Sequence, residues 1–119
     1  MTRPLRLQFE DAYYHVINRG LERKRIVLKQ ADHDEFVKLL QDVSIRWGVK
    51  VIAYCLMSNH YHVFLQTPRG NLSRVMRHLD GLYTQYFNRT YRRDGPLFRG
   101  RYRAIGKIGS SLDFGLGVL

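Results

Sequence analysis

The chain has 119 residues, of which 45% are hydrophobic, so it is long enough for one packed domain, too short for two, and too apolar to be disordered. Its 20 Lys and Arg side chains outnumber the 10 Asp and Glu side chains and give a formal net charge of +10. Such an excess favours a polyanionic partner, usually nucleic acid, over a solvated basic surface that serves only solubility.

Nothing in the sequence predicts a membrane span or an export route. No apolar run approaches the roughly 20 residues that span a bilayer, and the N-terminal residues lack the apolar core of a signal peptide. The single cysteine, Cys55, lies in an apolar run, and we expect it to be buried in a reducing compartment. These features predict a cytoplasmic protein with no membrane partner.

The first half of the chain predicts a strand, a helix and a second strand. Aromatic and β-branched residues at 13–17 are typical of a strand. Residues 32–35 resemble the capping box of a helix start, apolar side chains then recur at helical spacing over residues 36–47, and Gly48 ends the helix. The nearly continuous apolar run at 49–57 predicts a central strand that is buried on both faces.

The second half predicts a strand at 60–67, a helix that Asn71 or Ser73 caps, and a last strand at 97–105. The helix has a marked apolar stripe, and Gly81 within it suggests a close backbone approach. The resulting order, β-α-β-β-α-β, predicts an α+β, ferredoxin-like domain over residues 1–119, with an antiparallel sheet and both helices on one face.

His60 and His62 are the most informative pair of residues. Side chains two positions apart on a strand point to the same side of the sheet, so both imidazoles should project from one face while Tyr61 is buried in the core. Two neighbouring imidazoles can bind a divalent metal. The alternative is that one histidine is packed and the other solvated.

Arginines dominate the basic residues near the C-terminal end of the chain, where residues 89–107 hold one acidic side chain, Asp94. Arginine favours bidentate contacts to phosphate and stacking on bases. A sheet face free of helices, bearing the histidines, aromatic residues and these arginines, would suit single-stranded nucleic acid. The predicted DNA contacts are Arg19, Arg69, Arg74, Arg99, Arg101 and Arg103.

Four ordered segments resemble the single-tyrosine HUH transposases, in particular their REP-associated branch. The segments are residues 14–20 (YHVINRG), 54–65 (YCLMSNHYHVFL), 71–76 with 83–89 (NLSRVM and YTQYFNR), and 95–102 (GPLFRGRY). The resemblance implies that His60 and His62 help to hold Mg²⁺ or Mn²⁺ beside a scissile phosphate. It also implies a phosphotyrosine intermediate, a single-stranded or hairpin DNA substrate, and a homodimer.

The C-terminal end of this chain departs from the family pattern. The family carries its nucleophilic tyrosine and a third metal-binding group on a helix after the last strand, whereas residues 106–119 contain four glycines and no Tyr, His, Gln or Glu. We therefore predict a non-family-like tail at 106–119, from a frame lost near residue 106, with a genuine short variant as the alternative. No catalytic tyrosine is assigned, and we expect DNA binding without cleavage by this chain alone.

Several alternatives remain open at this point. Tyr83, Tyr86 or Tyr91 could replace the missing nucleophile, and a truncated chain could pair with a full-length copy. A non-catalytic nucleic-acid-binding module would use the same face and charge without a metal. A small metal-dependent hydrolase would need a further ligand, and Asp11 and His15 do not lie at a ligand-like spacing.

Overall fold

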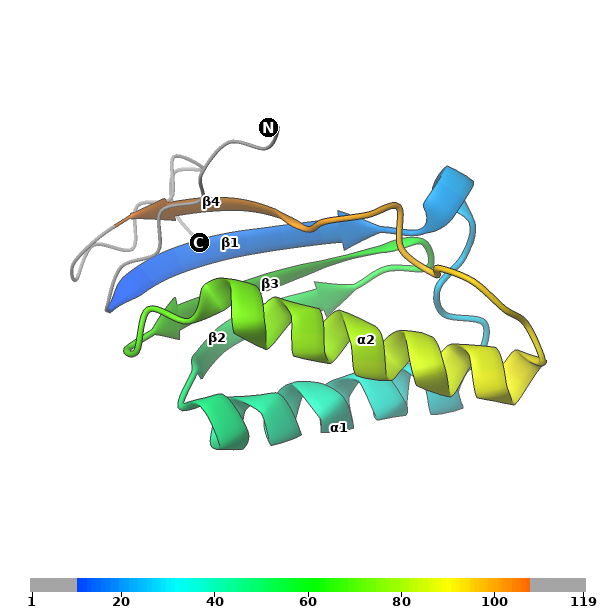
Figure 1. Ribbon diagram of the computed structural model, residues 1–119, viewed down its shortest axis with the longest axis horizontal. Coiled ribbons are helices and arrows are strands. Elements are labelled where there is room, and N and C mark those ends of the chain that lie inside the picture. The colour runs from blue at the N-terminus through cyan, green and yellow to red at the C-terminus, as the bar shows by residue number, and fades with distance from the viewer. Residues whose placement is uncertain (1–10, 108–119) are drawn as a thin grey trace.

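The computed structural model of the protein describes residues 11–107, which form a four-stranded sheet and two α-helices. In chain order the elements are β1 (Ala12–Arg19), the short 3-10 helix η1 (Leu21–Arg23), α1 (Gln30–Trp47), β2 (Lys50–Leu56), β3 (His60–Thr67), α2 (Leu72–Tyr91) and β4 (Arg103–Lys107). Both α-helices cover the same face of the sheet (Figure 1). The predicted ferredoxin-like α+β fold is therefore confirmed.

The sheet has the strand order β2-β3-β1-β4, and every neighbouring pair is antiparallel. The central strands are thus β1 and β3, and the edges are β2 and β4. Across the sheet, Ile17 pairs with both His62 and Arg103, and Arg19 pairs with His60. Since side chains alternate along a strand, all five point to the face that the α-helices do not cover, which we call the open face.

The core lies between the sheet and the two helices. Tyr61, Val63 and Leu65 of β3 are fully buried there, as the alternation of that strand predicts. The ring of Phe36 on α1 lies 5.1 Å from that of Tyr61 and 5.4 Å from that of Tyr83 on α2. The predicted apolar stripe of α2 is confirmed, with its buried members at Leu72, Val75, Met76, Leu79, Tyr83 and Phe87. Within residues 11–107, neither helix is long and apolar enough to cross a bilayer.

Asp32 lies inside the first turn of α1, which begins at Gln30, two residues before the predicted start. Its carboxylate accepts hydrogen bonds from the backbone nitrogens of Leu28 (2.9 Å) and Lys29 (3.2 Å). It also accepts the hydroxyls of Tyr86 (2.7 Å) and Tyr91 (2.6 Å) on α2. One carboxylate therefore satisfies the free donors at the start of α1 and fastens α2 to it.

The prediction of a doubly buried central strand at 49–57 is wrong. The corresponding strand, β2, is an edge strand, and five of its seven residues are exposed. Cys55 is exposed too, on the open face opposite His62, so its expected burial is also wrong. A run of apolar residues does not distinguish a buried central strand from an edge strand, because the position of a strand in the sheet depends on which other strands pair with it.

Two further local predictions fail. The last strand starts at Arg103, not at residue 97, because Leu97, Phe98 and Tyr102 turn into the core without the alternation of a strand. Gly81 allows no close approach: apart from its own stretch of α2, no atom of the described residues comes within 4 Å of the place that a β-carbon would take.

Candidate nucleic-acid interface and histidine cluster

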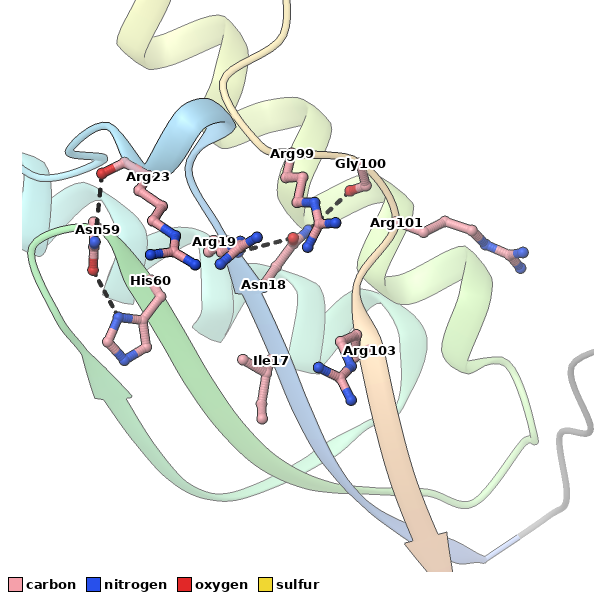
Figure 2. A pocket seen from close by; sticks show the side chains of 10 residues that line it. All are labelled: Ile17, Asn18, Arg19, Arg23, Asn59, His60, Arg99, Gly100, Arg101 and Arg103. Atoms are coloured by element: carbon pink, nitrogen blue, oxygen red, sulfur yellow. Dashed lines mark hydrogen bonds between the residues drawn. The ribbon is translucent and has the colours of Figure 1, made fainter.

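A pocket of about 700 Å³ lies at the end of the open face where β1 finishes and β3 begins. Arg19 and His60, which pair across the two strands, both line it. None of its lining residues is acidic, and five are arginines; the full set is Ile17, Asn18, Arg19, Arg23, Asn59, His60, Arg99, Gly100, Arg101 and Arg103. Figure 2 shows Arg19, Arg23, Arg99 and Arg103 directed toward a common space, while Arg101 extends away from them.

The arginines of this pocket repel one another. Burial, followed by the positive charges of Arg99, Arg23 and Arg103, lowers the pKa of the Arg19 guanidinium. Like charges that are held this close create a positive potential that an anion relieves. The pocket is therefore suited to phosphate oxygens, which arginine binds in a bidentate manner.

Backbone hydrogen bonds bring the arginine-bearing segments together although they are far apart in the sequence. The Gly20 nitrogen donates to the Asn59 carbonyl (2.9 Å), which joins the end of β1 to the β2–β3 turn. The Arg99 nitrogen donates to the Arg19 carbonyl (2.8 Å), and the Leu21 nitrogen donates to the Leu97 carbonyl (2.9 Å). The pocket thus combines the end of β1, η1, the β2–β3 turn and the segment before β4.

His60 and His62 project from the same face of β3, as predicted, with ring centroids 5.1 Å apart. Asn59 orients the first ring. Its Nδ2 donates to the Arg23 carbonyl (3.4 Å), which leaves its Oδ1 to accept from Nδ1 of His60 (2.8 Å; Figure 2). Because Nδ1 then carries the proton, Nε2 of His60 keeps the lone pair that can bind a metal.

A third histidine joins the pair from the neighbouring strand. Nε2 of His15 on β1 lies 2.8 Å from Nδ1 of His62, and the His15 ring stacks on Phe64 with centroids 4.3 Å apart. Burial, and then the neighbouring imidazole, lower the pKa of both His15 and His62. Lower pKa values favour the neutral ring, the form in which histidine binds metals.

The three histidines do not form a complete metal site. Within residues 11–107, no group of three or more His, Cys, Asp or Glu side chains is placed to hold a metal ion. His15 contacts His62 through Nε2, so this nitrogen is not free to bind a metal. His60 can offer Nε2, and His62 can offer Nε2 in the tautomer whose Nδ1 donates to His15. Two such ligands fit two positions of a hard cation; oxygen ligands must supply the others.

The predicted arginines divide into two groups in space. Arg19, Arg99, Arg101 and Arg103 all line the pocket. Arg69 and Arg74 lie elsewhere: the Arg69 guanidinium packs near Gly48 at the end of α1, and Arg74 lies over the Trp47 ring at 5.9 Å. A role for these two in DNA binding stays a prediction.

Sequence reasoning did not assign three residues of this region: His15, which it weighed as a metal ligand and set aside, Arg23 and Asn59. His15 is separated by 47 positions from His62, which it contacts through strand pairing, so no local spacing could identify it. Arg23 belongs to a visible basic run at 23–25, and Asn59 directly precedes His60. Only these two had a signal in the sequence.

The tyrosines of α2 are engaged in the packing of the helices, on the side of the sheet opposite the pocket. The Tyr83 hydroxyl donates to the Ile26 carbonyl (2.6 Å), and those of Tyr86 and Tyr91 donate to Asp32. Burial raises the pKa of all three, that of Tyr91 to about 12. Their hydroxyls are therefore poor candidates for a nucleophile on the open face.

Comparison with known proteins places the chain in a family. The model of the family described as IS200-like transposases matches residues 8–111. The chain belongs to the IS200-like transposases. The family match extends beyond Gly106 and Lys107, which complete β4, and the remainder of the predicted tail lies outside the described residues. The lost frame near residue 106 therefore stays a prediction.

Two solved structures share the fold of this transposase chain. One, a REP-associated tyrosine transposase bound to a REP hairpin, superposes with a TM-score of 0.73 at 12% identity, over 92% of this chain and 64% of the relative. The other, a Deinococcus radiodurans R1 protein that is named as a transposase, has a TM-score of 0.66 at 18% identity, over 93% of this chain and 88% of the relative. This chain thus spans less than two thirds of the hairpin-bound relative. A comparison with curated proteins finds no match.

Proposed function

We propose that this chain binds single-stranded DNA beside a hairpin, through the arginine pocket on the open face of its sheet. The observation that carries the proposal is a pocket with five arginines, His60 and no acidic side chain among its lining residues. Membership of the IS200-like transposases and the fold shared with a hairpin-bound transposase support DNA as the polyanion. A cytoplasmic location is part of this proposal, because the substrate is DNA.

We propose further that His60 and His62 hold Mg²⁺ or Mn²⁺ through their Nε2 atoms. The hydrogen bond from His60 to Asn59 supports this, because it places the lone pair of His60 on the nitrogen that faces away from Asn59. A bound metal would polarise a phosphate oxygen and stabilise the charge that develops during cleavage. The arginines would hold the DNA backbone, and the adjacent histidines would face the phosphate.

In this proposal, the chain binds DNA without cleaving it by itself. The hydrogen bonds of Tyr83, Tyr86 and Tyr91 within the helical layer support this reading, and Tyr61 is buried in the core. Cleavage and strand transfer through a phosphotyrosine, the chemistry of the family, would then require a tyrosine from a partner chain, because residues 1–10 and 108–119 of this chain contain none.

A cleavage assay tests this proposal directly. The purified protein is incubated with a labelled hairpin oligonucleotide that carries a single-stranded flank, with Mn²⁺ present, beside a His60→Ala/His62→Ala control. We expect a shifted non-covalent complex and no covalent protein–DNA adduct. An adduct that disappears in the histidine control would show that one of the chain's own tyrosines cleaves, and it would overturn the proposal of binding alone.

The role of the arginines is tested by the salt dependence of binding. Arg99→Ala and Arg103→Ala should each weaken binding to different sequences by a similar factor. Each should also reduce the slope of log Kd against log salt by about 0.7, the value for one phosphate contact on a single strand. Arg46→Ala is the matched control, because Arg46 lies over the Trp47 ring at the far end of α1. An unchanged slope in both pocket variants would place DNA elsewhere.

The second candidate is a nucleic-acid-binding module that uses no metal, in which the histidines contact bases or phosphates directly. The position of His60 among the arginines that line the pocket supports this alternative. Titration of DNA with and without a chelator separates the two. Unchanged affinity for a hairpin substrate on chelation, together with loss of affinity in the His60→Ala/His62→Ala variant, would support the metal-free module.

A further inference from the structure

Asn18 connects three segments of the fold with one side-chain amide. It lies on the helix-facing side of β1 and is 5% exposed. Its Nδ2 donates both to Oδ2 of Asp80 on α2 (3.0 Å) and to the carbonyl oxygen of Gly100 (3.1 Å). Its Oδ1 accepts from the backbone nitrogen of Arg19 (2.9 Å). The amide therefore makes hydrogen bonds with one group each in β1, α2 and the segment before β4.

The Gly100 contact lies between the arginines of the pocket. Residues 99–102 precede β4 and belong to no strand, and Gly100 and both its neighbours, Arg99 and Arg101, are exposed. The Arg99 nitrogen is bonded to the Arg19 carbonyl, and the Tyr102 hydroxyl lies 3.0 Å from Oγ of Ser73. The Asn18 amide contacts the backbone between those two points, at the position from which Arg99 and Arg101 diverge (Figure 2).

Asp80 determines which way the Asn18 amide points. Its Oδ1 accepts the hydroxyl of the buried Tyr61 at 2.6 Å, so the carboxylate is fixed from the core side. Burial raises the pKa of Asp80 to about 7, so above that pH its ionised carboxylate only accepts hydrogen bonds, and Asn18 must present Nδ2 to it. The second hydrogen of that nitrogen is then directed to Gly100, and Oδ1 is left for Arg19.

We infer that Asn18, oriented by Asp80, is a positioning residue that sets the conformation of residues 99–103 and so the arrangement of the DNA-binding arginines. The predicted effect on DNA binding rests on the proposed function. The predicted effect on the conformation of residues 99–103 rests only on the contacts described above. It predicts that position 18 needs both a donor and an acceptor in a short planar group, which asparagine supplies and aspartate does not.

The test exchanges the two side chains in the double variant Asn18→Asp/Asp80→Asn. In mildly alkaline buffer the new pair keeps one amide–carboxylate hydrogen bond, the acceptor for the Arg19 nitrogen and an acceptor for the Tyr61 hydroxyl. It leaves the Gly100 carbonyl without its donor. It also places a carboxylate in the lining of the pocket, so hydrogen exchange of the free protein, and not weaker DNA binding, decides the positioning role. Tyr61→Phe is the matched control, because it removes a hydrogen bond to Asp80 and leaves the Asn18–Gly100 contact in place.

Amide hydrogen exchange of the free protein and DNA affinity are measured on both variants under conditions where circular dichroism shows them folded. In the double variant we expect faster exchange confined to residues 97–103. We also expect roughly tenfold weaker binding, equivalent to about 1.4 kcal/mol, and a smaller salt slope. Tyr61→Phe should lower global stability and leave both local exchange and affinity within about twofold of the wild type, because it removes no arginine–phosphate contact.

Wild-type exchange at 97–103 in the folded double variant would overturn the inference, whatever the result with DNA. Faster exchange with wild-type affinity and slope would overturn the role in DNA binding. If the wild-type protein itself fails to bind the hairpin oligonucleotide, the proposed function fails, and the exchange measurement still decides whether Asn18 holds the segment.

Discussion

At the scale of single residues, asparagine amides orient the groups of the open face. Asn59 contacts the Arg23 carbonyl with one end and His60 with the other, and Asn18 does the same between Asp80, Gly100 and Arg19. A planar amide with a donor and an acceptor can impose a direction on a neighbouring ring or carbonyl, which a hydroxyl or an aliphatic side chain does not.

The orientation of His60 leads to a prediction about metal affinity. Asn59→Ala removes the acceptor at Nδ1 of His60 and should weaken Mn²⁺ binding roughly tenfold or more, as loss of such supporting groups usually does. Asn59→Asp keeps an acceptor at the same place and should retain at least wild-type affinity. Isothermal titration with Mn²⁺ measures both, with Gln66→Ala as a control on the same strand. Equal affinities for Asn59→Ala and the wild type would refute the role of Asn59.

Asp80 makes the stability of the protein depend on pH. Burial raises its pKa from the ordinary 3.8 to about 7, although the hydrogen bonds from Tyr61 and Asn18 act to lower it. Arg77 and Arg101 line the same small cavity as Asp80. The folded protein therefore holds this proton more tightly than the unfolded chain, so the contribution of Asp80 to stability falls as the pH rises from about 4 to about 7.

Asp80→Asn should remove this dependence. We expect the free energy of unfolding of the variant, relative to the wild type, to increase steadily over that pH range and to stay constant above it. Urea denaturation at a series of pH values measures the difference. A difference that does not change with pH would mean that Asp80 is ionised throughout.

At the scale of elements, the turn after β1 depends on a glycine. A β-carbon at Gly20 would lie 2.1 Å from the carbonyl oxygen of Lys24, in the backbone of the loop that follows η1. The same turn is held to the β2–β3 turn and to residues 97–99 by backbone hydrogen bonds, so it cannot shift without displacing Arg19 and Arg23.

Gly20→Ala should therefore lower the free energy of unfolding by about 1–3 kcal/mol, the usual range for a substitution that forces a backbone rearrangement. Gly81→Ala in α2 is the opposite case: apart from its own stretch of α2, its added carbon meets no atom of the described residues within 4 Å, and it should stabilise the protein by about 1 kcal/mol through helix propensity. Chemical denaturation compares the two. Equal effects would show that the contact with Lys24 is relieved at little cost.

At the scale of the whole molecule, the two faces of the sheet have different chemistry. The helix side holds the core, and the open face holds the histidines and the arginine pocket. The edge strand β2 adds a third surface: Ile52 is 44% exposed, Tyr54 41%, and Ile45 on the adjacent α1 82%. Together they line an apolar groove of about 730 Å³.

An exposed apolar edge strand is a ready partner for a second strand, so we predict that the homodimer expected from the sequence forms through β2. Ile52→Lys should shift the protein to a monomer, measured by sedimentation equilibrium over a range of concentrations. Ile105→Lys on the other edge strand, β4, is the control. If only the β4 variant is a monomer, the dimer interface lies at β4 and not at β2. A monomeric wild type would refute the predicted dimer.

By itself, the sequence determined the order of the elements, the stripe of α2, the burial of Tyr61 and the common side of His60 and His62. Each follows from periodicity along a single element, since a strand repeats every two residues and a helix every 3.6. Tertiary structure decided which strands are edges, and hence the exposure of β2 and Cys55. It also brought His15 to His62 and gathered Arg19, Arg23, Arg99 and Arg103 into one pocket. These contacts join residues tens of positions apart, and strand pairing, which no local pattern encodes, selects them.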